Sequence, residues 1–415
     1  MAGKKILILC NKFPYPTTDG GTIAMMNMIK GFYREGVEVT VMAMNTYKHS
    51  VELEDLPEHI QQMAQYVAVD VDIRLKLFPM GWNLLAEETP YHTRRFTSKS
   101  FRQEVQELVE LHEYDLVQLE GLYLTEYIKT IKAAAASRPH PKPLPVVLRA
   151  HNIEHEIWKR QADQTTNSLR KYYFNTTANR IKAYQEQHLR NKNYDAVVPI
   201  TKRDATELKK MGANVPVHVC PAGIDTDRLQ GYSDGNKQIR SLFYIGALDW
   251  MPNIEGLKWF LKHVWPRLND TFPDVKLHIA GRNMDPFFED AESESVVVHG
   301  EVPDAFEFMS ANGIMLVPLF SGSGMRVKII EGMALAKPIV ATSIAAEGIP
   351  AQHGDHLLIA DDPDAYFNCV ATLLEEPNQA IAMGKHGKSF VLKQFDNQAQ
   401  IQDLLGFYEK EFWGK

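Results

Sequence analysis

Short apolar runs alternate with amphipathic helical patterns along most of this 415-residue chain, and this alternation constrains the fold more than any other feature. The first run, residues 6–10, precedes a glycine-bearing loop, a helical pattern from about residue 22 to residue 34, and a second run at 37–43. Short buried runs separated by helices are typical of βαβ units, in which helices cover a parallel sheet. The sequence therefore predicts an α/β protein built on parallel sheets.

The apolar runs form two series, which predicts two Rossmann-like domains that face a cleft. A chain of 415 residues is too long for a single hydrophobic core. Segment 221–238 is rich in Gly, Asp and Pro and lacks periodicity, so we place the hinge there. We expect an N-terminal domain at 1–220, a C-terminal domain at 221–395, and a final helical segment, 396–415, that crosses back to the N-terminal domain. Further strands are expected at 116–119, 146–150, 196–200 and 217–220, and then at 242–245, 275–280, 296–299, 314–317, 339–341 and 357–359.

The composition argues against several classes of protein. A formal charge of −7 argues against nucleic-acid binding, because domains of that kind are usually basic. Cys10, Cys220 and Cys369 form no CxxC pair and have no histidine at ligand spacing, which argues against a disulfide framework or a zinc site. The first apolar run is too short for a signal peptide, and no later run reaches the ~18 residues of a membrane span. We therefore expect a cytoplasmic protein.

Segment 320–349 contains the densest group of candidate functional residues. Gly322, Ser323 and Gly324 follow the expected strand 314–317 and precede a helix that we expect to open at Met325. Glycines let the backbone approach a ligand closely, and the first N–H groups of a helix have no partner within the helix. The pattern indicates an anion site at a helix N-terminus.

Two cations, Arg326 and Lys328, lie in the first turn of that helix. Cations there oppose the helix dipole by roughly 0.3–1 kcal/mol each, and a bound diphosphate would reverse this cost. Glu331 lies further along the helix, where a carboxylate can accept hydrogen bonds from vicinal ribose hydroxyls. The alternative interpretation of Glu331 is a surface residue paired with Lys328, three residues away.

Two loops of the first half also follow expected strands. Gly20 and Gly21 precede the first helix and indicate either a phosphate-binding turn or an ordinary helix cap. Glu120 ends the run at 116–119 and is a candidate to face the second substrate.

His151 and Asn152 come directly after the expected strand 146–150, a position that favours a cleft over a core. The alternative is that His151 caps the next helix. A metal site formed by His151 and His155 would lack a third ligand, so we predict no metal.

Several segments occur in the order of a known family. They are YPTTDGGTIAMMNMIKGF, RAHNIEHEIW, VVPITKRDA, CPAGID, FYIGALDWMPNIEGLKWF, LHIAGRN, VVVHGEVPD and the whole of 320–349. Together they resemble the retaining family-4 glycosyltransferases of the GT-B fold, and the resemblance runs through nearly the whole chain.

The resemblance implies roles for the residues described above. Glu331 matches the second glutamate of the family's E-x7-E motif, which contacts the donor ribose. Ser323 stands where the first glutamate, which helps to hold the transferred sugar, is usual. His151 and Asn152 match a pair that contacts the donor sugar.

The resemblance also places the nucleotide and its phosphates. Relatives hold the nucleotide at positions that match Arg282 and Val302, and the base contact comes largely from backbone around Val302. The loop at 20–21 matches one that faces the donor phosphate and the acceptor. Asp249 and Asn253 replace the family's usual Arg and Lys, so we expect the two cations at the start of the later helix to supply the diphosphate charge.

The expected activity is metal-independent transfer of a sugar, with retention, from a UDP- or GDP-linked donor to a glycan or lipid-linked acceptor, without a separate cofactor. We predict the catalytic residues His151, Arg326 and Glu331, and the donor-binding residues Gly20, Gly21, Asn152, Arg282, Val302, Gly322, Ser323, Gly324, Met325 and Lys328. Polysaccharide biosynthesis is the expected setting.

Two other functions remain open from the sequence. One is a nucleotide-sugar epimerase of the same architecture, and the other is a non-catalytic relative that binds a glycan or a partner protein, which Ser323 keeps open. In addition, residues 151–215 carry twelve Lys and Arg against seven Asp and Glu. This excess indicates either a solvated helix face or a peripheral contact with an anionic inner membrane face.

Overall fold

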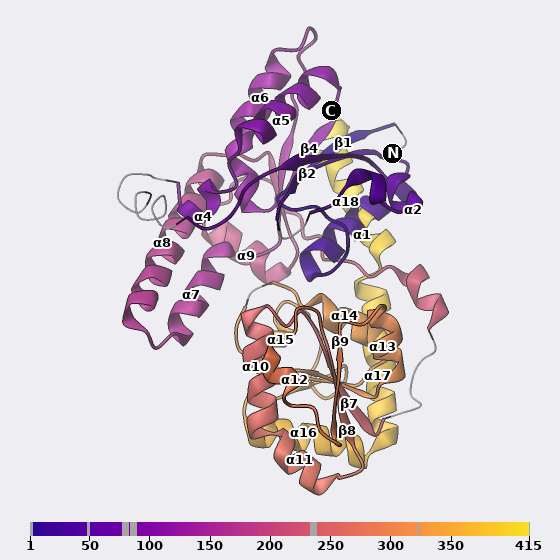
Figure 1. Cartoon of the computed structure of the whole chain (residues 1–415). Helices are drawn as coiled ribbons and strands as arrows, with labels where there is room; N and C mark the ends of the chain where they lie inside the picture. Colours follow the sequence, from indigo (N-terminus) through magenta and orange to yellow (C-terminus); the bar gives the residue numbers. More distant parts are fainter. Residues whose placement is uncertain are drawn as a thin grey trace. The chain divides into compact units, whose positions relative to one another are not determined.

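The computed structural model describes residues 3–47, 50–76, 83, 89–232, 239–322 and 324–414. The chain divides into two units (Figure 1). The N-terminal unit comprises Met1–Ala222 together with Gln398–Lys415, and the C-terminal unit comprises Gly223–Asn397. Residues 233–238 of the expected hinge lie outside the described residues.

The N-terminal unit is built on a six-stranded parallel sheet of order β3-β2-β1-β4-β5-β6. Its strands are β1 (Lys5–Cys10), β2 (Glu38–Asn45), β3 (Gln65–Asp70), β4 (Leu116–Glu120), β5 (Val146–Ala150) and β6 (Ala196–Pro199). Its helices are α1 (Gly20–Arg34), α2 (Glu58–Gln61), α4 (Tyr91–Arg94), α5 (Lys99–Leu111), α6 (Ile128–Ala136), α7 (Glu154–Gln164), α8 (Ser168–Arg190), α9 (Lys202–Lys210) and α18 (Asn397–Tyr408). Short 3-10 turns lie at Leu53–Asp55 and Leu122–Tyr127, and a π-helical turn at Glu409–Trp413 follows α18.

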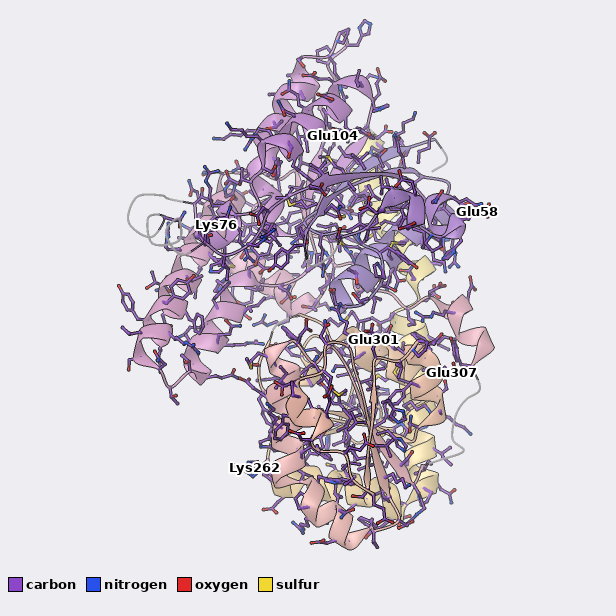
Figure 2. All side chains as sticks on the ribbon, in the orientation of Figure 1. Glu58, Lys76, Glu104, Lys262, Glu301 and Glu307 are labelled. Carbon is purple, nitrogen blue, oxygen red and sulfur yellow. The ribbon has the colours of Figure 1, made fainter. Side chains whose placement is uncertain are left out.

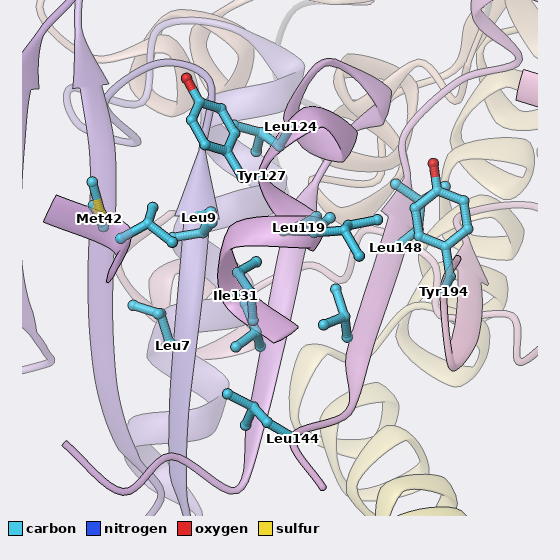
Figure 3. Close-up of a cluster of buried hydrophobic side chains, with 14 of the residues drawn as sticks. Leu7, Leu9, Met42, Leu119, Leu124, Tyr127, Ile131, Leu144, Leu148 and Tyr194 are labelled. Atoms are coloured by element: carbon cyan, nitrogen blue, oxygen red, sulfur yellow. The ribbon is translucent and has the colours of Figure 1, made fainter. Parts of the chain in front are cut away.

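Both faces of the central part of this sheet are buried, which explains why a strand such as β1 is a continuous apolar run. Leu7 and Leu9 of β1 belong to one core cluster, whereas Ile6 and Ile8 belong to the other. Successive side chains of a strand point to opposite faces, so an apolar run packs against the helices on both sides of the sheet. Figure 3 shows the first cluster, in which Leu7 and Leu9 pack with Leu119, Tyr127 and Ile131, among other residues.

Helix α18 covers the second face of the same sheet. Its apolar residues Ile401, Leu404, Leu405 and Tyr408 are at most 1% exposed and belong to the cluster that contains Ile8. Their spacing of three, one and three residues places them on one stripe of a helix. The end of the chain therefore contributes to the core of the N-terminal unit.

The C-terminal unit repeats the architecture with a six-stranded parallel sheet of order β12-β11-β10-β7-β8-β9. Its strands are β7 (Ser241–Ile245), β8 (Lys276–Ala280), β9 (Val296–Gly300), β10 (Ile314–Val317), β11 (Ile339–Ala341) and β12 (Leu358–Ile359). Its helices are α10 (Met251–His263), α11 (Trp265–Thr271), α12 (Pro286–Glu289), α13 (Ala305–Ala311), α14 (Val327–Ala334), α15 (Ser343–Ala346), α16 (Pro363–Glu375) and α17 (Pro377–Gln394), with a 3-10 turn at Thr226–Gly231. Charged residues such as Lys262 and Glu307 lie on the exposed faces of these helices (Figure 2).

Two details differ from the sequence-based expectation. The expected strand at 217–220 is wrong, because that segment contributes only an isolated bridge between Val217 and Val197. Strand β3, at the edge of the N-terminal sheet, was not expected. It is half-buried, so its pattern lacks the continuous apolar run that identifies the central strands.

Each sheet has one point at which its strand order reverses. In the N-terminal unit the chain runs outward from β1 through β2 to β3 and then returns to the other side of β1 with β4. In the C-terminal unit the corresponding neighbours are β7 and β10. Loops that leave two such strands diverge, and ligands of doubly wound sheets bind there at the carboxyl ends. The fold thus directs attention to the loops after β1, β4, β7 and β10.

Among the described residues, no helix combines the length and the apolar character needed to cross a membrane.

Candidate functional site

In the C-terminal unit, the loop after β10 leads to a helix that has two cations in or beside its first turn and, in the described part of the chain, no side-chain cap. Gly322 and Gly324 adopt φ values of 98° and 81°, a left-handed region that favours glycine. A side chain at Gly322 would also meet Trp250, because its Cβ would lie 3.0 Å from the indole ring. Helix α14 begins at Val327, two residues later than expected, with Arg326 as its N-cap residue. Ser323 lies outside the described residues.

Arg326 folds back over this loop. Its Nη1 donates to the carbonyl of Gly324 at 2.5 Å, and its Nη2 lies 3.5 Å from the carbonyl oxygen of Ser321. Its guanidinium carbon lies 5.8 Å from the centre of the Trp250 ring. The side chain is only 6% exposed, so a positive charge is held at the first turn of α14 with little water around it.

Lys328 connects α14 to the end of β7 and to the start of α10. Its Nζ donates to the carbonyl of Ile245 and to Oδ1 of Asn253, both at 3.1 Å, and lies 4.6 Å from the centre of the Tyr244 ring. Burial, helped by the charge of Arg326, lowers the pKa of Lys328 to about 7. The ammonium group therefore lies at the reversal point between β7 and β10, where Gly246 leaves room for it: a Cβ there would be 2.9 Å from Nζ.

Glu331 is a buried carboxylate that lacks a hydrogen-bond partner among the described residues. Its residue exposure is 7%, and it forms no hydrogen bond to any residue that the structure describes. Burial raises the pKa of Glu331 to about 7, and the charge of Arg228 counteracts this only in part. The surface pair with Lys328 that the helical spacing allowed does not form, because the Lys328 ammonium points to Ile245 and Asn253 instead.

Arg228 is a functional candidate that the sequence did not indicate. It lies in the 3-10 turn Thr226–Gly231, within a segment without periodicity. Its guanidinium lies 3.7 Å from Oδ1 of Asp304 and 4.1 Å from the centre of the Phe306 ring. Only the tertiary structure brings the charge of Arg228 within electrostatic reach of Glu331, whose raised pKa it counteracts.

The remaining predicted residues of this unit follow neighbouring strands. Arg282 follows β8 and is half-buried, and its Nε is a buried donor without a hydrogen-bond partner in the described part of the chain. Val302 follows β9 and is half-buried, whereas Met325 is 7% exposed beside the N-cap of α14.

In the N-terminal unit, the carboxylate of Asp19 occupies the N-terminus of α1, at the end of the loop after β1. Asp19 caps α1 by accepting hydrogen bonds from the backbone N–H groups of Gly21 at 2.9 Å and Thr22 at 3.0 Å. The Lys12 ammonium lies 2.6 Å from the same carboxylate. The capping interpretation therefore accounts for the local structure at Gly20 and Gly21, and their contact with phosphate stays a prediction.

The ends of β4 and β5 form a buried charged cluster. Glu120 and Arg149 are partners in the register of these strands, and Nη1 of Arg149 lies 3.2 Å from Oε2 of Glu120. Nε2 of His151 lies 2.5 Å from the same oxygen. Burial alone would raise the pKa of Glu120, but Arg149 and the hydrogen bonds from His151 and Gln118 lower it to about 2. The carboxylate is ionised and 2% exposed, so it faces these side chains and not a second substrate.

Next to this cluster, the first residues of α7 extend the polar edge. Glu154 is buried, and it accepts a hydrogen bond from the Tyr123 hydroxyl at 2.7 Å and one from Asn152. Burial lowers the pKa of His155, so its ring favours the neutral form. Within the described ranges, no group of three or more His, Cys, Asp and Glu side chains could hold a metal ion.

A family model described as Glycosyltransferase Family 4 matches residues 18–228, just over half of the 415 residues. The chain belongs to this family. A second model, described as Glycosyl transferases group 1, matches residues 239–376 of this family-4 glycosyltransferase and thus covers the sheet of its C-terminal unit.

Solved structures show the same fold. Sucrose-phosphate synthase from Thermosynechococcus elongatus superposes with a TM-score of 0.70 at 15% identity, over 99% of this glycosyltransferase and 100% of that chain. Anabaena HepE in complex with UDP gives a TM-score of 0.64 at 15% identity, over 98% of this chain and 100% of that one. The two parallel sheets are therefore those of a GT-B glycosyltransferase.

A curated relative extends over nearly the whole chain. An uncharacterized 44.6 kDa protein in the cps region of Klebsiella pneumoniae is 22% identical over 412 residues, which is 97% of this glycosyltransferase and 99% of the relative.

The structure thus groups the predicted residues into two sets within this glycosyltransferase. The C-terminal set brings together Arg326, Lys328 and Asn253, with Glu331 one turn further along α14. The N-terminal set brings His151 and Asn152 to one sheet edge, together with Glu120. Sequence reasoning missed Arg149, Gln118 and Arg228. A signal existed for the first two, because polar residues inside buried strands need buried partners.

Proposed function

We propose that this glycosyltransferase binds a UDP- or GDP-linked sugar at the carboxyl edge of the C-terminal sheet. It transfers the sugar with retention, without a metal and without a separate cofactor, to a hydroxyl group of a glycan or lipid-linked acceptor. The observation that carries the proposal is Glu331, a buried carboxylate that lacks a hydrogen-bond partner in the described structure.

The carboxylate of Glu331 can accept hydrogen bonds from the ribose hydroxyls of a nucleotide. A carboxylate that no described side chain or backbone group hydrogen-bonds keeps both oxygens open to donors from a ligand. Two vicinal hydroxyl groups would donate to the two oxygens of Glu331 and would favour its ionised form. Nucleotide binding should therefore lower the raised pKa of Glu331.

The N-terminus of α14 suits the diphosphate. Among the described residues, no side chain caps the first N–H groups of α14, and the Arg326 guanidinium and the Lys328 side chain lie in or beside its first turn. A diphosphate would favour protonated Lys328 and raise its lowered pKa. The same groups would stabilise the charge that develops on the leaving diphosphate, which is where preorganised electrostatics contribute most to catalysis.

The other predicted residues complete the donor and transfer assignments. Arg282 follows β8, the neighbour of β7, and Val302 follows β9, the next strand outward, and we assign Arg282 and the backbone at Val302 to the nucleotide. We assign His151 and Asn152 to the transferred sugar, and Gly20 and Gly21 to the donor phosphate and acceptor. HepE has been solved with UDP-glucose and a trehalose-6-phosphate protein of E. coli with UDP-2-fluoro glucose, and these relatives support a uridine donor.

The acceptor assignment rests on a curated relative. The Klebsiella pneumoniae relative belongs by its name to the cps region, which supports a role in polysaccharide biosynthesis.

Calorimetric titration tests the donor site. Wild-type protein is titrated with UDP, GDP, ADP and TDP without added metal, next to Glu331→Ala and the control Glu375→Gln, which removes an exposed carboxylate at the end of α16. We expect one nucleotide to bind, with affinity about tenfold lower in Glu331→Ala, a loss of ~1.4 kcal/mol, and unchanged in Glu375→Gln. If no nucleotide binds with a dissociation constant below about 1 mM, the donor-site proposal is wrong.

Product analysis separates the alternative functions. Turnover of a nucleotide sugar without any acceptor would favour an epimerase, and nucleotide binding without turnover would favour a non-catalytic relative. Acceptor-dependent release of the nucleotide, with the anomeric configuration retained in the product, is the result that we expect.

The first turn of α8 supports a peripheral contact with an anionic membrane surface. Leu169 and Tyr172 are 82% and 74% exposed, and the exposed residues Arg170 and Lys171 lie between them. Apolar and basic side chains together suit the interface of an anionic bilayer. We expect wild-type protein to float with phosphatidylglycerol vesicles and the double variant Leu169→Ser, Tyr172→Ser to remain below. Equal flotation with phosphatidylcholine vesicles would contradict the electrostatic part.

A further inference from the structure

A continuous chain of buried hydrogen bonds connects the C-terminal helix α18 to His151. The Tyr408 hydroxyl donates to Oε1 of Gln118 at 2.8 Å, and Nε2 of Gln118 donates to Oε1 of Glu120 at 2.5 Å. Nε2 of His151 contacts the other oxygen of Glu120 at 2.5 Å. Tyr408 and Gln118 are 0% exposed, and Glu120 is 2% exposed.

The direction of every hydrogen bond in this chain is determined. Glu120 is ionised, so its oxygens only accept, and Nε2 of His151 must carry a proton. The amide of Gln118 has to direct its NH2 group to Glu120, which leaves its carbonyl oxygen for the Tyr408 hydroxyl. In a neutral His151 ring, Nδ1 is then the nitrogen without a proton.

The chain of contacts exists because of strand alternation. Gln118 and Glu120 are two residues apart on β4, so they share the face of the sheet that α18 covers. Arg149, the partner of Glu120 on β5, shares that face and donates to the carbonyl of Ala24 in α1 at 3.3 Å. These polar side chains therefore lie in an otherwise apolar layer.

Packing alone does not call for these polar groups. The apolar stripe of α18, with Ile401 and Leu404, already seats the helix on the sheet, and apolar residues at Gln118 and Tyr408 would avoid the cost of burying polar atoms. The contacts instead end at His151, whose side chain is 16% exposed and is the most accessible member. A buried polar chain of this kind holds its last member in one orientation.

We propose that α18 positions His151 for the transfer reaction through Tyr408, Gln118 and Glu120. Tyr408 and Gln118 are positioning residues, since they act through Glu120. The catalytic part rests on the proposed function of His151, whereas the structural part does not. Because Tyr408 is part of α18, the hydrogen-bond chain couples the seating of this helix to the orientation of His151.

Two variants interrupt the contacts, and a matched variant does not. Tyr408→Phe removes one hydroxyl and keeps the ring, and Gln118→Met keeps the approximate shape of the side chain. Tyr127→Phe is the control, because it removes another fully buried hydroxyl of the same unit, which donates to the carbonyl of Phe96 at 2.7 Å.

The first readout is independent of activity. In protein labelled with ¹⁵N at the histidine rings, His151→Gln identifies the signals of His151. We expect the wild-type spectrum to show protonated Nε2, and both Tyr408→Phe and Gln118→Met to shift these signals while Tyr127→Phe leaves them in place. Unchanged His151 signals in both variants, or an equal shift in the control, would overturn the proposal.

The second readout is kinetic. We expect Tyr408→Phe to lower kcat by about tenfold, corresponding to ~1.4 kcal/mol, with donor KM within about twofold of wild type. Nucleotide affinity, measured by calorimetry, should not change. A loss confined to donor KM would contradict the proposal. If no nucleotide binds to wild-type protein, the donor site fails, but the ring spectra still decide whether α18 positions His151.

Discussion

Glu120 and Glu331 are two buried carboxylates near the reversal points of the two sheets, and their surroundings are opposite. Glu120 is 2% exposed and lies against Arg149, His151 and Gln118, and its pKa is lowered to about 2. Glu331 is 7% exposed, has no hydrogen bond within the described structure, and has a pKa raised to about 7. Burial is similar in both, so the partners decide the ionisation. A carboxylate whose partners are supplied by the protein orients other groups, whereas one without partners suits a ligand.

The largest effect is expected when Glu120 loses its ion-pair partner. Arg149→Met leaves a buried carboxylate with less compensation, and we expect the free energy of unfolding at pH 7 to fall by about 3–5 kcal/mol. Urea denaturation measures this change. In the double variant Arg149→Met, Glu120→Gln, part of the loss should return. If the double variant is no more stable than Arg149→Met, Arg149 does not compensate the buried charge of Glu120.

A gain of stability is expected for Glu331→Gln. The folded-state pKa of Glu331, about 7, lies above its ordinary value of 4.5, so the folded state binds this proton more tightly. The resulting stabilisation is complete below pH 4.5 and is lost as the pH rises through 7. At pH 8 the amide should therefore increase the free energy of unfolding by up to ~3 kcal/mol, with little change at pH 4. Thermal unfolding at both pH values measures this, and the exposed control Glu375→Gln should show no such difference.

The smallest effect is expected for Arg228→Met. Arg228 counteracts the raised pKa of Glu331, but its side chain is 45% exposed, so solvent screens the interaction and it amounts to less than about 1 kcal/mol. We expect the pH at which nucleotide affinity declines on acidification to rise by less than about one unit, as calorimetry at several pH values would record. A shift of several units would mean that Arg228 is as strong a partner for Glu331 as Arg149 is for Glu120.

The sequence predicted the helical and sheet layers well where a strand is buried on both faces. The run at 6–10 became β1, and the run at 314–317 became β10, because continuous apolar residues have no other favourable location. Half-buried β3 escaped prediction, and segment 217–220 was wrongly expected to be a strand.

Of the candidate site, the sequence indicated the cations and carboxylate of α14 because they lie close together in the chain. Helical spacing left open whether Lys328 pairs with Glu331, and the structure excludes that pair by directing the ammonium group to Ile245 and Asn253. Arg228 and Tyr408 lie far in sequence from the groups they affect, so no local pattern reveals them. The roles of the predicted site residues themselves stay predictions.

By itself, then, the sequence determined the two βα series, the family, and the glycine loop with its adjacent cations at the start of a helix. These features depend on local propensity, on the period of apolar residues and on motif order, all of which a linear chain expresses directly. Only the tertiary structure decided that Glu120 is fully partnered and Glu331 is not. Desolvation and hydrogen bonding depend on which segments, distant in sequence, come into contact. For Glu120, strand register and the packing of α18 on the N-terminal sheet determine these contacts.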